Sequence, residues 1–367
     1  MKKIVFATLR DNKGATGGPG GVLYLNKTII GKSINNQTKC FYWFNKYQSN
    51  SIKHYKLINK IVFTFKSLLS FKTLFVVHDI DAAFILSKLK KKYILVYHQQ
   101  GPLLREYSNF GVVLSKKNAN TISKIERKAF ISAQKIHFPS IGAKKMYFED
   151  NLASCSINEV TCGEPLYNTI PEMIISNNNI DIDDCFNGIT LFSLGTLTEA
   201  KGQDRVVDFL EEFLSLTNKR IRYIIVGDGP LRNTVINKCE DLKVKNNNFY
   251  YIYFPKLSHE KVMSIHFISD IYIMLHRLSI FDFATLEAMN NNCAIVLSSI
   301  GGNQDFNKND NIIYIDNPKS DARKLLNINI EQLKKKNKEV FCSYFSNYAF
   351  KERYIKTIFE QLKNDKS

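Results

Sequence analysis

The sequence predicts an α/β protein built from two Rossmann-like, doubly wound domains in tandem. At 367 residues the chain is longer than one ordinary domain. Short apolar runs rich in β-forming residues alternate with longer helical patterns, as in parallel sheets covered by helices. Near the middle, residues 166–188 interrupt this alternation with Pro171, an Asn run and Gly188, which are typical of a linker.

The expected strands form two series, one on each side of this break. The first series is 3–8, 40–44, 74–78, 93–98, 135–139 and 160–162; the second is 189–194, 223–226, 249–253, 271–275, 294–297 and 312–315. We therefore expect an N-terminal domain over 1–165, a linker over 166–188 and a second domain over 189–343. An amphipathic helix is expected in the C-terminal segment, 344–367, and either packs on the second domain or crosses back to the first.

The net charge of +17 comes entirely from the N-terminal half. Residues 1–165 carry 26 Lys and Arg against 9 Asp and Glu, whereas residues 166–367 carry 25 of each. Such asymmetry predicts that the first half meets an anionic partner. Nucleic acid, a phospholipid surface and a phosphorylated acceptor are the candidates; no nucleic-acid-binding motif accompanies the charge, so we expect no nucleic acid, and we expect an anionic membrane surface as a partner. Scattered lysines that only keep the protein soluble are the alternative.

The beginning of the chain and its apolar runs predict the location of the protein. The first residues resemble a strand and lack the apolar stretch of a signal peptide. No apolar run reaches the roughly 20 residues that cross a bilayer. We therefore expect a cytoplasmic protein, bound peripherally to the inner face of the plasma membrane. The seven cysteines include no C-x-x-C pair and are expected to be reduced thiols.

The segment 276–303 contains the strongest signal for a binding site. Asp282 follows an expected strand and is the expected N-cap of a helix that carries Glu287. Backbone amides at the start of such a helix, at Phe283, Ala284 and Thr285, can bind a diphosphate without a cationic side chain. A carboxylate just over one turn into the helix can accept hydrogen bonds from a ribose diol. The alternative is an ordinary surface helix.

This segment resembles the signature of family 4 and related retaining glycosyltransferases, E-x-F-G-x-x-x-x-E-A-M-x-x-G-x-P-V followed by a small-residue turn and G-G. The matching residues are Phe281, Glu287, Ala288, Met289, Gly301 and Gly302. In the family the second Glu binds the donor ribose, which implies that role for Glu287. The first Glu lies near the sugar in the family; Ser279 stands at its position here, and its role stays open.

Two further segments follow the family's order and spacing. The segment 194–202 is similar to G-R-L-x-x-x-K-G, whose Arg and Lys hold the diphosphate. Lys201 matches the Lys, but Thr196 stands at the Arg position, so Arg205 and Arg277 are candidates to replace that cation. The segment 223–232 matches a strand followed by a G-D-G-P turn, for which we expect a structural role.

Two features of the first half are expected to contribute to the same site. Glycines at 17, 18, 20 and 21 follow the first strand, and backbone amides there can approach a phosphate or sugar closely. Family members have a glycine pair at this place, which implies donor contacts for Gly20 and Gly21. His98 ends an expected strand on the side where doubly wound sheets bind ligands. The resemblance places it near the transferred sugar; a hydrogen-bonded loop histidine is the alternative.

Two Asp-x-Asp triplets suggest a metal site that we do not expect. Asp79 with Asp81, and Asp181 with Asp183, resemble the carboxylate pairs that hold Mn²⁺ or Mg²⁺ in the other major glycosyltransferase fold. The two-domain pattern belongs to the fold that works without such a metal, and the second triplet lies in the expected linker. We therefore expect no metal and no cofactor, the nucleotide sugar being the donor substrate.

The resemblance implies the GT-B fold, in which an N-terminal acceptor-binding domain and a C-terminal nucleotide-sugar-binding domain face each other across a cleft. It implies a hexosyltransferase-type enzyme that moves a sugar, with retention, from a nucleoside diphosphate sugar to a polysaccharide or lipid-linked oligosaccharide such as O-antigen, capsule or lipopolysaccharide. His98, Lys201 and Glu287 are the expected catalytic residues. A noncatalytic GT-B homologue that binds a ligand or partner, or a sugar-nucleotide epimerase, stays open.

Residues 51–72 predict a basic amphipathic helix that can contact a membrane. Its apolar stripe comprises Ile58, Ile61, Val62, Phe65, Leu68 and Leu69, and its basic side comprises Lys53, Lys56 and Lys60. Leu57 and Phe63 lie off the stripe and are expected to stay partly exposed. The alternative is a helix that packs on the sheet through this stripe and leaves its lysines in water.

Overall fold

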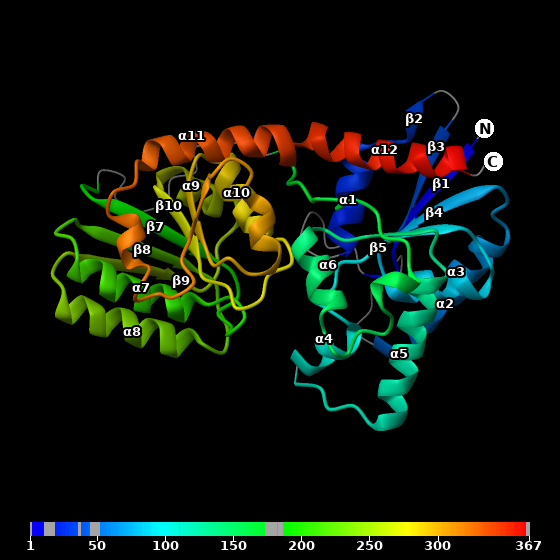
Figure 1. The fold of residues 1–367 in the computed structure, drawn as a ribbon, viewed down its shortest axis with the longest axis horizontal. Coiled ribbons are helices and arrows are strands. Elements are labelled where there is room, and N and C mark those ends of the chain that lie inside the picture. Colours follow the sequence, from blue (N-terminus) through cyan, green and yellow to red (C-terminus); the bar gives the residue numbers. More distant parts are fainter. Residues whose placement is uncertain are drawn as a thin grey trace. The chain divides into compact units, whose positions relative to one another are not determined.

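The computed structural model describes residues 2–10, 19–35, 38–44, 52–109, 111–172, 182 and 186–364, without the side chains of residues 35, 52–55, 363 and 364. The chain forms two compact units (Figure 1). The N-terminal unit comprises Met1–Pro171 together with Asn347–Ser367, and the C-terminal unit comprises Glu172–Ser346.

The N-terminal unit contains a six-stranded sheet in the order β2-β3-β1-β4-β5-β6. Its strands are β1 (Lys2–Ala7), β2 (Ser33–Asn35), β3 (Thr38–Trp43), β4 (Thr73–Val77), β5 (Tyr93–Val96) and β6 (Lys135–His137). All neighbours pair in parallel except β2, a short edge strand antiparallel to β3 that the sequence pattern did not predict. The strand expected over 160–162 is wrong, because this segment makes only an isolated bridge from Cys162 to Ile136.

Helices cover this sheet, and several begin at side-chain caps. They are α1 (Pro19–Ile29), α2 (Ile52–Leu68), α3 (Ile80–Lys88), α4 (Leu103–Asn109), α5 (Lys116–Ile131) and α6 (Ile141–Phe148), followed by the short helix η1 (Ile157–Glu159). Asp79, Ser115 and Ser140 cap α3, α5 and α6 by accepting hydrogen bonds from backbone amides in the first turn. Helices α2 and α5 both pack against α3.

The C-terminal helix α12 (Asn347–Asn364) belongs to the N-terminal unit, although it follows the second unit in sequence. At its start Thr169 donates a hydrogen bond to Asn347 over 3.0 Å, and Arg353 lies over the ring of Tyr167. Further along, Tyr354 is buried and stacks on His78, with 6.4 Å between the ring centroids. Figure 1 shows α12, in red, beside α1. The chain therefore crosses back to its first unit.

The C-terminal unit has a second six-stranded sheet, in the order β12-β11-β10-β7-β8-β9 and parallel throughout. Its strands are β7 (Ile189–Leu194), β8 (Ile221–Val226), β9 (Phe249–Phe254), β10 (Ile271–Met274), β11 (Ala294–Leu297) and β12 (Ile312–Tyr314). Four of these strands, β7, β8, β10 and β11, have almost wholly buried side chains, as expected for a sheet covered on both faces.

Helices lie on both faces of the second sheet (Figure 1). They are α7 (Gln203–Ser215), α8 (Arg232–Lys245), α9 (His259–Ile268), α10 (Phe283–Asn290) and α11 (Ile330–Val340), with the short helices η2 (Gly301–Phe306), η3 (Ala322–Leu325) and η4 (Phe341–Phe345). Side chains of β7, β8, β10 and α7 form one apolar core. The two parallel-sheet units confirm the predicted α/β class.

Helix α2 is oriented differently from an ordinary surface helix. Its apolar stripe faces outward: Ile61, Phe65 and Leu69 are 51%, 64% and 72% exposed. The side that packs on the unit carries Asn59, Phe63 and Ser67 instead. The exposure expected for Leu57 is found, whereas that expected for Phe63 is wrong, because this ring is buried edge-on against Trp43.

Candidate functional site

In each sheet, the strand order reverses between one pair of adjacent strands: the chain builds the sheet outward on one side of this pair and then on the other. These pairs are β1 with β4 in the N-terminal unit and β7 with β10 in the C-terminal unit. In open α/β sheets, ligands bind beyond the carboxyl ends of the strands at this switch point. The candidate residues Lys201 and His98 lie in loops at these edges, after β7 and β5.

The G-D-G-P turn after β8 holds the loop after β7 in place. Gly227 has φ +140°, and a Cβ atom there would lie 2.0 Å from the carbonyl oxygen of Gly195. Backbone hydrogen bonds join the two loops: Leu197 donates to Asp228 over 3.1 Å, and Leu231 donates to Leu197 over 3.0 Å. Only glycine permits this close approach. The turn therefore shapes the loop that carries Lys201.

Lys201 forms an ion pair with Asp282 at the centre of the switch point. Its Nζ lies 2.6 Å from Asp282 Oδ1, and both side chains are largely buried. Burial acts to raise the pKa of Asp282, but the charge of Lys201 outweighs it and lowers that pKa to about 2. Next to Lys201, Gly202 has φ +73° and leaves no room for a Cβ atom beside the Leu275 carbonyl. This packing brings the ammonium group to the end of β10.

Helix α10 begins beside this ion pair. Asp282 occupies the N-cap position, as expected, but makes no side-chain capping hydrogen bond. Its carboxylate accepts from Lys201, from the Tyr272 hydroxyl over 3.3 Å and from the Thr285 hydroxyl over 3.5 Å. The first amides of a helix have no intrahelical acceptor. The N–H groups at Phe283, Ala284 and Thr285 thus start a helix whose first turn lies beside the Lys201 and Asp282 ion pair.

Glu287 is held by two histidines of α9. His259 Nε2 lies 3.0 Å from Glu287 Oε1, and His266 Nε2 lies 3.9 Å from Oε2. Burial acts to raise the pKa of Glu287, but the hydrogen bond with His259 and the nearby His266 ring outweigh it and lower that pKa. The same pair raises the pKa of His259. Glu287 is therefore an ionised, mostly buried carboxylate, not an ordinary surface residue.

The two departures from the family pattern lie in different surroundings. Thr196 is exposed in the loop after β7, whereas Ser279 is buried and its carbonyl accepts a hydrogen bond from the Gly302 amide. Both candidate replacements for the family Arg are engaged in other contacts. Arg277 forms a two-pronged ion pair with Asp204, at 2.9 and 2.6 Å. Arg205 donates to the carbonyls of Leu275, His276 and Asp316. We therefore assign neither to the diphosphate.

In the N-terminal unit, His98 belongs to a buried chain of hydrogen bonds. Its Nε2 lies 3.0 Å from Nδ1 of His78, and the two rings stack. Asn26 Nδ2 approaches the other nitrogen of His78, Nε2, at 3.2 Å. Burial lowers the pKa of His98 to about 3 and that of His78 well below its usual value. Both rings are thus neutral at physiological pH.

With the Asn26 amide nitrogen facing His78, the contacts fix the position of each proton. Asn26 donates to His78 Nε2, so the proton of neutral His78 lies on Nδ1. His78 Nδ1 then donates to His98 Nε2, and the proton of His98 lies on Nδ1. His98 can therefore donate a hydrogen bond without carrying a charge.

The first Asp-x-Asp triplet has structural roles in this unit. Asp79 caps α3 and accepts hydrogen bonds from the Thr8 hydroxyl and the Leu9 amide, each over 2.7 Å. Asp81 pairs with Lys60 at 2.8 Å. Asp181 and Asp183 lie outside the described residues. Within the described part of the chain, no group of His, Cys, Asp and Glu is placed to hold a metal ion.

The glycines after β1 are only partly described. Gly17 and Gly18 lie outside the described residues, whereas Gly20 and Gly21 are buried in the first turn of α1. The structure places these two at the carboxyl edge of β1. Their contact with a donor stays a prediction.

Sequence reasoning missed the residues that position the expected site residues. His78 directly follows β4, so its place at a strand end was a signal that could have been used. His259 and His266 lie seven positions apart on α9, and this spacing places them on one face of a helix. Nothing in the sequence indicated that this face would meet Glu287.

Residues 187–351 match the sequence profile of glycosyl transferases group 1. No curated protein sequence matches the chain significantly.

Several solved structures are similar over the whole chain. Sucrose-phosphate synthase from Thermosynechococcus elongatus has a TM-score of 0.68 at 12% identity, with 100% of both chains covered. A glycosyltransferase from Rickettsia africae has a TM-score of 0.64 at 14% identity, covering 99% of both chains. Anabaena HepE in complex with UDP has a TM-score of 0.61 at 14% identity, covering 98% of this chain and 100% of that one. At such identities the similarity establishes the fold.

The two parallel-sheet units and these similarities define a protein of the GT-B fold. The C-terminal unit carries the glycosyl transferases group 1 match together with the Lys201, Asp282 and Glu287 arrangement. The chain is a glycosyltransferase.

Proposed function

We propose that the protein transfers a sugar from a nucleoside diphosphate sugar to a lipid-linked or polysaccharide acceptor, with retention of configuration, as in family 4. The observation that carries the proposal is Lys201, held 2.6 Å from Asp282 beside the first turn of α10. A cation and helix amides arranged in this way suit a departing diphosphate. The HepE structures contain UDP, and one also contains glucose, which supports a nucleotide-sugar donor.

The proposed reaction breaks the bond between C1 of the sugar and the diphosphate oxygen. Lys201 and the amides of Ala284 and Thr285 neutralise the charge that develops on the diphosphate. The acceptor oxygen bonds to C1 on the face from which the diphosphate departs, and its proton passes to a phosphate oxygen. Glu287 holds the ribose of the donor. We propose that no metal ion takes part, since Asp79 and Asp81 are engaged in the fold.

A thermal-shift screen tests the donor class and the metal proposal together. The full chain is mixed with UDP-, GDP-, ADP- and dTDP-sugars, each in EDTA and in Mn²⁺. We expect one nucleotide family to raise the melting temperature equally in both conditions. A shift that requires Mn²⁺ contradicts the metal-free site, and no shift with any donor contradicts the donor proposal.

For His98 we propose a hydrogen bond from its neutral ring to a hydroxyl of the transferred sugar. The support is its place after β5 and the His78 contact that leaves the proton of His98 on Nδ1. Because burial lowers its pKa to about 3, the His98 ring stays neutral near neutral pH. His78 positions this ring, and Asn26 positions His78.

We predict that His98 stays neutral between about pH 5 and 8, because its pKa lies below this range. His259 provides the internal comparison, since its hydrogen bond with Glu287 raises its pKa above 6.5. Imidazole resonances assigned by NMR should therefore shift with pH for His259 and stay constant for His98. A His98 resonance that titrates with a midpoint near 6.5 contradicts the buried pair.

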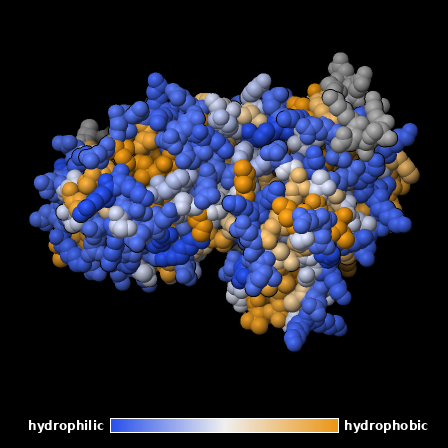
Figure 2. Space-filling view, in the orientation of Figure 1, coloured by the Kyte–Doolittle hydropathy of each residue, from blue (hydrophilic) through white to orange (hydrophobic). Residues whose placement is uncertain are grey.

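For location we propose that the N-terminal unit binds the inner face of the plasma membrane. The outward apolar stripe of α2 supports this, because soluble proteins rarely expose so many large apolar side chains side by side. Figure 2 shows hydrophobic surface at the edge of the N-terminal unit where Figure 1 places α2 and α3. None of the helices in the described residues is long and apolar enough to cross a bilayer.

A second apolar patch supports the same proposal. The connection between α4 and α5 exposes Val112 and Val113, the latter at 96%, and Figure 2 shows apolar surface at this end of the unit. Lys116 and Lys117, three and four residues after Val113, lie in the first turn of α5 and are exposed. Each basic residue near an anionic leaflet contributes about 1 kcal/mol. Exposed apolar and basic side chains therefore occur together at both places.

We predict that replacing Phe65 and Leu69 by Ser weakens binding to anionic vesicles about tenfold or more, because each large apolar side chain contributes about 1.5 to 3 kcal/mol when it leaves water. Both side chains are exposed, so the fold should tolerate the change. The measurement is sedimentation with anionic and neutral liposomes at low and high salt.

Val244→Ser is the matched control, because Val244 is 84% exposed on α8 of the other unit. This variant should bind vesicles like the wild type. Equal binding of the wild type to anionic and neutral vesicles at low salt, or unchanged binding of the Phe65 and Leu69 double variant, contradicts the membrane proposal. Lys60 is unsuitable for charge reversal, since a glutamate there would face Asp81.

A further inference from the structure

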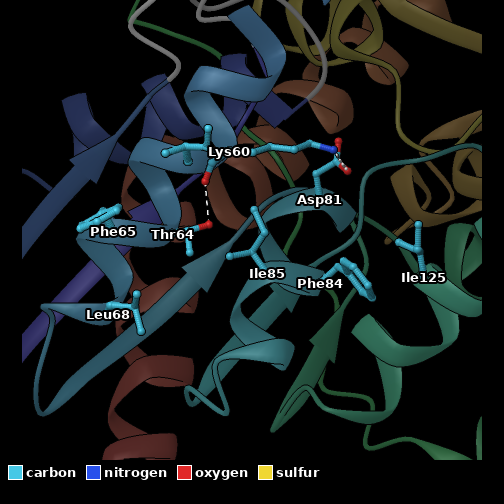
Figure 3. A pocket seen from close by; sticks show the side chains of 9 residues that line it. Lys60, Thr64, Phe65, Leu68, Asp81, Phe84, Ile85 and Ile125 are labelled. Atoms are coloured by element: carbon cyan, nitrogen blue, oxygen red, sulfur yellow. Dashed lines mark hydrogen bonds and ion pairs between the residues drawn. The ribbon is translucent and has the colours of Figure 1, made fainter. Parts of the chain in front are cut away.

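A groove opens between α2 and α3, and a residue of α5 completes its wall (Figure 3). Its volume is about 370 Å³, within the range of small-ligand sites. The apolar lining comprises Ile61, Phe65 and Leu68 of α2, Phe84 and Ile85 of α3, and Ile125 of α5. Residues of three helices thus form one largely apolar groove on the N-terminal unit.

The polar side chains of the groove bond within its wall. Lys60 Nζ pairs with Asp81 Oδ1 at 2.8 Å, and the Thr64 hydroxyl donates to the Lys60 carbonyl over 2.7 Å. Figure 3 shows the Lys60 and Asp81 pair at one end, with aliphatic and aromatic side chains along the rest. An occupant with polar groups along its length would lose hydrogen bonds to water without replacement. The lining therefore suits a plain hydrocarbon chain.

We propose that this groove binds one acyl chain of an anionic phospholipid. The inference rests on the proposed membrane docking, because Ile61, Phe65 and Leu68 belong both to the groove and to the outward stripe of α2. A unit lying on a bilayer through that stripe has the groove mouth against the leaflet. The two helices that form the groove also carry exposed lysines, Lys56 on α2 and Lys88 at the end of α3.

Charge favours an anionic phospholipid over a second copy of the chain as the occupant of the groove. Residues 1–165 carry 26 basic residues against 9 acidic ones, so pairing two such surfaces brings like charges together. A phospholipid with a negative headgroup has the complementary charge, and its chain fits the apolar walls. We therefore expect the groove to bind a phospholipid in preference to the basic surface of a second copy of the chain.

The experiment uses a soluble lipid, so that groove binding is separated from docking on a bilayer. Dihexanoyl-phosphatidylglycerol below its micelle concentration is titrated into the full chain by calorimetry, with chain-free glycerophosphoglycerol as the second probe. We expect the chain-bearing lipid to bind and the chain-free headgroup to show at least about tenfold weaker binding, since burial of each CH₂ contributes about 0.8 kcal/mol. Equal binding of both probes overturns the proposal.

Two variants fill the groove from different helices, Ile85→Trp on α3 and Ile125→Trp on α5, and each is checked for an unchanged melting temperature. A folded variant should bind the soluble lipid at least about tenfold more weakly; unchanged affinity in a folded variant overturns the site. Leu69→Ser, outside the groove, is the matched control and should keep soluble-lipid binding while binding anionic vesicles more weakly. A wild type that sediments with anionic vesicles but binds no soluble lipid overturns the groove and leaves the docking proposal standing. Soluble-lipid binding without vesicle binding overturns the docking proposal instead.

Discussion

Replacing Lys201 by Ala is expected to reduce sugar transfer about a hundredfold or more. The change removes a charge-assisted contact of about 2 to 3 kcal/mol to the departing diphosphate. The measurement is kcat/KM for the identified donor, with melting temperature recorded in parallel. Transfer at the wild-type rate contradicts the assignment of Lys201 to the donor site.

The Lys201 variant also disturbs the fold, and a second change separates the two effects. Without Lys201, the carboxylate of Asp282 is mostly buried and lacks its cation, which costs about 3 kcal/mol or more of folding free energy. Adding Asp282→Asn removes the unpaired charge. We expect the double variant to recover most of the melting temperature and none of the transfer. Recovery of transfer in the double variant shows that Lys201 serves only to neutralise Asp282.

Replacing Glu287 by Ala is expected to cost a similar factor, about a hundredfold, because the carboxylate accepts hydrogen bonds from the donor ribose in our proposal. The loss should appear mainly as weaker donor binding, measured by titration of the nucleoside diphosphate alone. The neutral Glu287→Gln variant keeps one acceptor oxygen and should lose less.

His259→Ala is the control for this prediction, because it removes the partner of Glu287 without touching the carboxylate. If Glu287 only fastens α9 to α10, the two alanine variants lose equal amounts of transfer and the ribose assignment is wrong. The pair also has a pH signature. Since the folded pKa of His259 is raised, its stabilising contribution is present below about pH 6.5 and is lost as the pH rises through the folded pKa.

Much of the fold was predictable because its signals are local. All strands except β2 follow from short apolar runs, and the turn after β8 follows from its glycines, which the close packing of that turn requires. The enzyme class followed from residues in a fixed order along one unit, and the profile match over residues 187–351 confirms it. The assigned roles of His98, Lys201 and Glu287 stay predictions.

The errors and omissions concern contacts between residues far apart in sequence. The carboxylate of Asp282 forms an ion pair with Lys201, 81 positions away, in addition to its contact with Thr285 in the first turn of its own helix. His98 meets His78 because they follow the neighbouring strands β5 and β4, a contact set by the strand order. For α2, periodicity identified an apolar stripe but not whether it faces the sheet or solvent. Buried Phe63 and exposed Phe65 show that packing decided that question.

Acceptor-dependent release of nucleotide tests the central claim most directly. The purified chain is incubated with the donor that stabilises it, with and without a lipid-linked glycan extract. The nucleoside diphosphate released and the labelled sugar incorporated into product are measured in the same samples. We expect nucleotide release that depends on the acceptor and equals the sugar incorporated, and that is lost in the Lys201→Ala with Asp282→Asn variant. Donor binding without nucleotide release in any extract would contradict the claim and identify a noncatalytic GT-B homologue. The feature that would fit this outcome is the exposed Thr196, which stands at the position of the family Arg.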